Sequence, residues 1–142
     1  MKNQKLTRLA GVLVALAVVA AAAGMALVQP AEFASRVAGK TAKPAVFMVG
    51  PAVLFRSKHI PGSIFAGPGQ SPAGLAMLKV ELDKLPRDRE VVVYCGCCPW
   101  DHCPNVKPAM NLLQIMGFTK AKVLYLGTGF KIDWMDKGYA AE

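Results

Sequence analysis

The chain has 142 residues, which is room for one domain. Its 17 Lys and Arg residues outnumber 9 Asp and Glu residues and give a net charge of +8. The bases are scattered and form no stripe interleaved with aromatic residues, so the composition excludes nucleic-acid binding as the main function.

The N-terminal segment has the pattern of a secretory signal. Residues 1–8 carry Lys2, Lys5 and Arg8 without an acid, and residues 9–28 carry no charge. We expect residues 1–23 to be a signal peptide, cleaved after the small residues 21–23. The alternative is an uncleaved membrane anchor, since about 20 apolar residues can span a bilayer. In both cases the domain lies outside the inner membrane, in the periplasm, and it contacts the membrane only if the segment is uncleaved.

The remaining sequence alternates between strand and helix patterns. We predict strands at 25–28, 45–49, 64–66, 91–94 and 122–126. We predict helices at 30–38, from 72 to 85, from about 105 to 116, and from 130 to the region of Trp134. The stretch through residues 56–58 is expected to be a loop. This alternation indicates an α/β fold, a single domain over residues 25–142 with a mainly parallel sheet and helices on both faces.

All the cysteines of the chain follow the apolar strand 91–94. The turn reads CGCCPWDHCPN and holds Cys95, Cys97, Cys98 and Cys103. In open α/β sheets, ligands bind in the crevice outside the carboxyl ends of the strands. Prolines at 99, 104 and 108 stiffen this turn. We therefore predict the functional site here.

The thiols admit three interpretations that the sequence leaves open. Cys97, Cys98 and Cys103 can be auxiliary or resolving thiols for Cys95, since Cys95 to Cys98 is a C-x-x-C motif. Alternatively, the four cysteines with His102 form a soft-metal site for copper or zinc. The third interpretation is a structural disulfide such as Cys98–Cys103.

Polar neighbours complete the candidate site. His102 and Asp101 can act as an acid/base pair, as a metal ligand with its carboxylate partner, or simply as a solvated loop tip. His59 is expected to order its own loop. The loop and the helix start also offer N–H groups to an anion. The residues assigned to this loop and anion-binding role are Gly96, Trp100, Asn105 and Lys107.

Three segments in order resemble a rhodanese-like (sulfurtransferase) domain. They are the HIPGS sequence at 59–63, the strand ending in Cys at 91–95, and the closing segment with GTGF at 127–130, Trp134 and GY at 138–139. The resemblance covers nearly all of the chain after residue 23. It implies the single-domain α/β fold described above.

The resemblance also implies an activity. Cys95 would be the nucleophile, a thiolate that accepts a sulfane sulfur as a persulfide and passes it to a thiol acceptor, without a cofactor. The start of the following helix would lower its pKa. The partners would be a small sulfur donor and a thiol acceptor. The family's Asp-x-Arg pair falls on Met48 and Gly50, and the turn lacks Arg, so we expect a polysulfide or a low-molecular-weight persulfide as donor.

Because the periplasm is oxidising, we expect the neighbouring thiols to form a disulfide there. The disulfide we expect joins Cys95 to Cys98, because adjacent Cys97 and Cys98 would pair only with strain. The isolated protein would then need reduction, and in the cell a periplasmic thiol reductase as partner.

Overall fold

A computed structural model describes residues 25–142. The predicted signal peptide or anchor, residues 1–23, lies outside this part of the chain. Within residues 25–142, every helix is too short or too polar to cross a membrane.

A five-stranded sheet forms the centre of the fold, in the order β1-β5-β4-β2-β3. Every neighbouring pair of strands is parallel. The strands are β1 (Leu27–Val28), β2 (Ala45–Met48), β3 (Ile64–Phe65), β4 (Val91–Tyr94) and β5 (Ala121–Leu124). β4 occupies the middle position and is buried throughout, which suits its run of β-branched residues.

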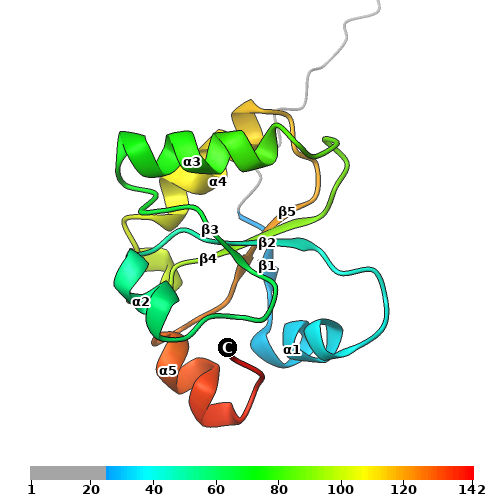
Figure 1. The fold of residues 1–142 in the computed structure, drawn as a ribbon, viewed down its shortest axis with the longest axis vertical. Coiled ribbons are helices and arrows are strands. Elements are labelled where there is room, and N and C mark those ends of the chain that lie inside the picture. Colours follow the sequence, from blue (N-terminus) through cyan, green and yellow to red (C-terminus); the bar gives the residue numbers. More distant parts are fainter. Residues whose placement is uncertain (1–24) are drawn as a thin grey trace, which may run out of the picture.

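Helices cover both faces of this sheet, as predicted (Figure 1). Helices α3 (Pro72–Leu82) and α4 (Val106–Ile115) lie on one face. On the other face lie α1 (Pro30–Ala38), α2 (Ala52–Ser57) and α5 (Phe130–Asp133), which is followed by the 3-10 turn η2 (Met135–Lys137). The predicted α/β fold class, a single domain with a parallel sheet between two helical layers, is confirmed.

Two hydrophobic cores follow from the alternation of side chains along β4. Val91, Val93 and Cys95 belong to the core beneath α3 and α4. Val92 and Tyr94 belong to the core beneath α1, α2 and α5. Fully burying one such valine contributes roughly 1.5–3 kcal/mol. The same alternation directs Cys95 and Tyr94 to opposite layers.

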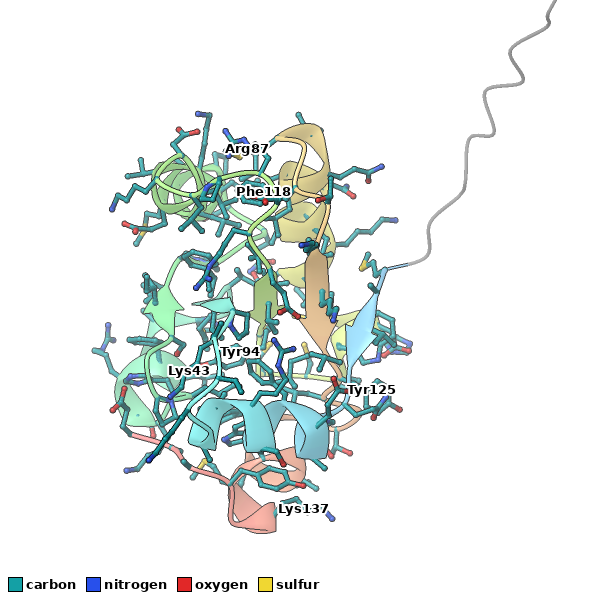
Figure 2. The ribbon with its side chains drawn as sticks, turned by 90° about the vertical axis from the view of Figure 1, so that its right-hand side faces the viewer. Lys43, Arg87, Tyr94, Phe118, Tyr125 and Lys137 are labelled. Atoms are coloured by element: carbon teal, nitrogen blue, oxygen red, sulfur yellow. The ribbon has the colours of Figure 1, made fainter. Side chains whose placement is uncertain are left out.

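Local signals explain most helix boundaries. Pro30 and Pro72 occupy the first turns of α1 and α3, and the Ser71 hydroxyl accepts the N–H of Gly74 at 3.0 Å. Gly117 follows α4 with φ +83, a conformation that favours glycine. Near the amino ends of the strands, the guanidinium of Arg87 stacks over the ring of Phe118, 4.8 Å from its centroid (Figure 2).

The prediction of a loop through residues 56–58 is wrong for residues 56 and 57, which belong to a helix. Residues 52–57 form α2, and the N–H of Lys58 bonds to the carbonyl of Leu54 at 3.0 Å. A helix of six residues is too short to show a periodic apolar pattern. Strand β5 ends at Leu124 instead of 126, although the N–H of Tyr125 still bonds to the carbonyl of Val28 at 2.9 Å.

An ion-pair cluster joins α1 to the start of β4. Glu90 accepts from Arg36 through both carboxylate oxygens, and Lys122 Nζ lies 3.1 Å from Glu90 Oε1. The hydrogen bonds from Arg36, supported by Lys122, lower the pKa of Glu90 to about 2 from 4.5. Because the pKa is depressed by folding, this stabilisation is complete above pH 4.5 and is lost as the pH falls through about 2.

We therefore predict that Glu90→Gln removes part of the acid sensitivity of unfolding. The free energy of unfolding, measured by urea denaturation at pH values between 7 and 2, should fall by about 1–2 kcal/mol less in this variant than in the wild type. Glu81→Gln, which removes a helix-surface pair with Lys84, is the matched control and should change the pH dependence by only a few tenths of a kcal/mol. An unchanged pH profile in Glu90→Gln would contradict this assignment.

Candidate functional site

The site begins where β2 and β4 end side by side. The Val49 N–H donates to the carbonyl of Tyr94 at 2.8 Å and continues the pairing of the two strands. Gly50 then packs directly on Cys95, so that an added Cβ at Gly50 would lie 2.5 Å from the Cys95 carbonyl oxygen and 2.9 Å from its sulfur. The backbone of β2 therefore forms one wall around Cys95.

Asn105 forms a second wall and positions the Cys95 sulfur. Its Nδ2 donates to Cys95 Sγ at 3.3 Å, and its Oδ1 accepts the N–H of Gln70 at 3.1 Å. Both Cys95 and Asn105 are 2% exposed. The sequence assigned Asn105 to anion binding at the loop, whereas the buried amide holds the sulfur of Cys95 in place.

The sulfur atoms of Cys95, Cys97, Cys98 and Cys103 converge into a thiol cluster, in which all lie within 4.8 Å of one another. Cys95 Sγ is 3.1 Å from Cys97 Sγ, which is 3.0 Å from Cys98 Sγ. Cys95 and Cys103 are buried, Cys98 is half-buried and Cys97 is exposed. All four are free thiols here. The Cys95–Cys98 disulfide stays a prediction.

Acidity within the thiol cluster differs from the sequence expectation. Hydrogen bonding to Cys103, burial and Cys97 raise the pKa of Cys95. Hydrogen bonds from Cys95 and from the backbone N–H groups of Asn105 and Val106 lower the pKa of Cys103 to about 5. The start of α4 thus stabilises a thiolate at Cys103 instead of Cys95. Burial raises the pKa of Cys98 to about 12.

His102 and Asp101 do not join the thiol cluster. They lie in a short 3-10 turn, η1 (Trp100–His102), where His102 Nδ1 is 3.0 Å from Asp101 Oδ1 and both side chains are exposed. Within residues 25–142, the potential metal ligands that lie together are the four cysteines, and His102, which the predicted ligand set included, is not among them. The pair is a solvated loop tip, and Lys107 is also exposed.

The cysteine turn is anchored to the end of β5 and the start of α5. Gly96 has φ +85, and its carbonyl accepts the N–H of Phe130 at 3.2 Å. The N–H of Trp100 donates to the carbonyl of Leu126 at 3.0 Å, and its ring centroid lies 6.3 Å from that of Tyr125. Trp100 thus packs on Tyr125 at the end of β5.

A largely apolar pocket of about 220 Å³ lies on the opposite side of β4 from the thiol cluster. Gly96, which links Cys95 to Cys97, lines it together with Tyr94. Sequence reasoning missed this pocket, whose only charged lining residues are two lysines. Its lining residues are Met48, Leu54, Ser57, Lys58, Tyr94, Gly96, Phe130, Lys131 and Met135.

The Tyr94 hydroxyl is hydrogen-bonded to the HIPGS loop. It accepts the N–H of Ile60 at 3.1 Å and lies 3.1 Å from the Ser63 hydroxyl. His59 stacks on Phe55 at 3.9 Å, and its Nδ1 lies 2.8 Å from the carbonyl of the same residue. The His59 ring thus packs on α2, in line with the expected structural role.

Comparison with known proteins agrees with this architecture. The family model described as Rhodanese-like domain matches residues 29–132. A crystal structure of the Alr3790 protein from Anabaena sp. superposes with a TM-score of 0.62 and 18% identity, over 81% of this chain and 90% of that chain. The single-domain sulfurtransferase RDL2 from Saccharomyces cerevisiae superposes with a TM-score of 0.61 and 16% identity, over 82% of this chain and 94% of that chain. No match was found among curated proteins. At these identities the solved structures establish a common fold.

The contact between Gly50 and Cys95 generates a direct prediction. Gly50→Ala should lower the stability by about 1–3 kcal/mol, because the new methyl group meets backbone that must shift. Thermal unfolding measures the loss. Gly129→Ala is the control: its added Cβ would meet only the Gly96 oxygen at an ordinary 3.5 Å, so it should have a much smaller effect. Equal melting temperatures for Gly50→Ala and the wild type would contradict the close approach.

Proposed function

This chain belongs to the rhodanese-like domain family, and we propose that it is an exported sulfurtransferase whose nucleophile is Cys95. The observation that carries this proposal is the position of the Cys95 sulfur. It lies at the carboxyl end of the central strand, held by Gly50 and Asn105 and in contact with a second thiol. This is where ligands bind in open α/β sheets.

The proposed reaction transfers one sulfur atom without a net change of oxidation state. The Cys95 thiol gives its proton to Cys103, to which it is hydrogen-bonded, and the resulting Cys95 thiolate attacks the terminal sulfane sulfur of a persulfide or polysulfide donor. The donor's S–S bond breaks, its thiolate leaves with the electron pair, and Cys95 carries a persulfide. An acceptor thiolate then attacks the outer sulfur of that persulfide. This second step regenerates the Cys95 thiolate and releases the acceptor persulfide.

Burial of Cys95 bears on how the sulfur arrives. Cys95 is only 2% exposed, so a bulky donor cannot approach it directly, whereas Cys97 is exposed and its sulfur lies 3.1 Å from that of Cys95. We propose that the donor first loads Cys97. The outer sulfur of the Cys97 persulfide then passes to the Cys95 thiolate, and the Cys97 thiolate leaves. Cys97 is thus the auxiliary thiol in this scheme.

The pocket lies across β4 from the sulfurs and approaches them at Gly96, so it fits the distal, non-reacting part of a donor or acceptor that extends past Gly96. Its apolar walls suit a small organic body, and Lys58 and Lys131 suit an anionic group. The turn contains no Arg to hold a dianion at two points. The apolar pocket and the lack of Arg in the turn support a thiol-derived persulfide or a polysulfide as the donor.

The N-terminal sequence pattern supports export, with residues 1–23 as a signal peptide or, alternatively, an anchor. In the periplasm the thiols would be exposed to oxidants, so a thiol reductase is part of the proposal as a partner.

We predict that Cys95→Ser retains no sulfur after the donor is removed, because sulfur that is loaded on the exposed Cys97 can no longer pass to Cys95 and stays open to attack by thiols. The metal-free, reduced protein is incubated with a low-molecular-weight persulfide, and intact mass spectrometry counts the added sulfur atoms. The wild type should gain one sulfur that thiol acceptors remove. Lys84→Ala, at an exposed site on the opposite end of the domain, is the control and should load like the wild type. If Cys95→Ser, with an unchanged circular dichroism spectrum, loads and releases sulfur normally, Cys95 is not the nucleophile.

A second prediction addresses the route through Cys97. In Cys97→Ser the final adduct on Cys95 should still form, but the rate of loading should fall about tenfold, which corresponds to about 1.4 kcal/mol in the barrier. Rapid quenching followed by peptide mapping measures this rate. Loading at the wild-type rate would show that donors reach Cys95 directly.

A further inference from the structure

The spacing of the sulfur atoms in the thiol cluster suits a metal ion. Zinc bound to four thiolates at about 2.3 Å holds their sulfurs about 3.8 Å apart. In this structure Cys97 Sγ lies 3.0 Å from Cys98 Sγ and 3.1 Å from Cys95 Sγ, and all four sulfurs lie within 4.8 Å of one another. The cluster therefore reaches tetrahedral spacing by shifts of less than about 1 Å.

The surroundings of the cluster also suit bound thiolates. The Asn105 amide donates a hydrogen bond to Cys95 Sγ, and backbone N–H groups at the start of α4 face Cys103. Hydrogen bonds of this kind orient metal ligands and stabilise their charge. No carboxylate or imidazole of residues 25–142 joins the group, because Asp101 and His102 face each other in solvent. The donor set is entirely sulfur, which favours soft ions.

From this geometry we infer that the thiol cluster binds one thiophilic metal ion with a filled d shell, Zn(II) or Cu(I), through Cys95, Cys97, Cys98 and Cys103. Metal–sulfur bonds form as the ion gives up its solvent ligands, and the thiol protons pass to solvent. Neither ion changes its oxidation state. The exposed Cys97 and half-buried Cys98 provide the access route for the ion. Because the same sulfurs are used, a metal-loaded chain cannot accept a sulfane sulfur at Cys95.

The test uses the full chain, reduced and freed of metal under anaerobic conditions. One sample receives Zn(II) and another Cu(I), each with a competing chelator, and both are desalted. Elemental analysis gives the metal per chain, and alkylation followed by mass spectrometry gives the number of protected cysteines. We expect one ion per chain and four protected cysteines with at least one of the two metals. Substoichiometric metal together with unprotected thiols in both samples would overturn the inference.

Variants identify the ligands. Cys97→Ser, Cys98→Ser and Cys103→Ser should each weaken binding of the retained metal by at least about tenfold, and Asn105→Ala, which removes the hydrogen bond to Cys95, by roughly tenfold. His102→Ala is the matched control and should bind as the wild type does. Circular dichroism checks that each variant is folded, and the exposed Cys97 keeps the test informative if a buried substitution unfolds the chain. An equal loss in His102→Ala would refute the all-sulfur site.

Metal binding and sulfur transfer are measured separately in these experiments. Metal per chain is determined without any sulfur donor, and sulfur loading is determined on metal-free protein. A chain that binds metal and never carries a persulfide would refute the proposed function alone. A chain that transfers sulfur and retains neither ion would refute this inference alone.

Discussion

The close pairing of β2 with β4 at their carboxyl ends is the constraint on which the site depends. The pairing continues beyond Met48 through the Val49 N–H, so the next residue must lie against Cys95. Only glycine fits at position 50, where a side chain would enter the space of the Cys95 carbonyl and sulfur. With the backbone fixed in this way, the alternation of β4 sends Cys95 toward α4 and Tyr94 toward the apolar pocket. The thiol cluster and the apolar pocket thus lie on opposite sides of β4.

The sequence was sufficient for the architecture because its signals are local. Apolar runs, helix-starting prolines and the terminal Gly117 predicted the order of strands and helices, and the ordered motifs predicted the rhodanese-like family that the family comparison confirms. The position of the cysteines after β4 also predicted where the thiols gather. The six residues of α2 were missed because so short a helix shows no period.

The details of the site depend on contacts between distant residues, which a single sequence does not display. The Asn105 amide is held in place beside Cys95 because its oxygen accepts the N–H of Gln70, which is 35 residues away in the sequence. The metal-site alternative placed His102 among the ligands because it is close to the cysteines in the sequence, whereas in the structure it lies in an exposed 3-10 turn. Which of four adjacent thiols is buried, and which lies at the start of α4, depends on the path of the turn in space. That path is set by bonds to Leu126 and Phe130.

Because the proposed nucleophile, Cys95, is buried among other thiols, the proposed sulfur transfer and the proposed metal binding compete for the same sulfurs. The chain surrounds Cys95 with thiols and the Asn105 amide. The central claim is that a sulfur atom carried by this cluster can be delivered to a thiol. The most direct test is a single turnover with isotopically labelled sulfane sulfur. The chain is loaded, the donor is removed, and a thiol acceptor is added. We predict that the label leaves as the acceptor's persulfide. Label that stays on the protein, or never enters it, would contradict the account.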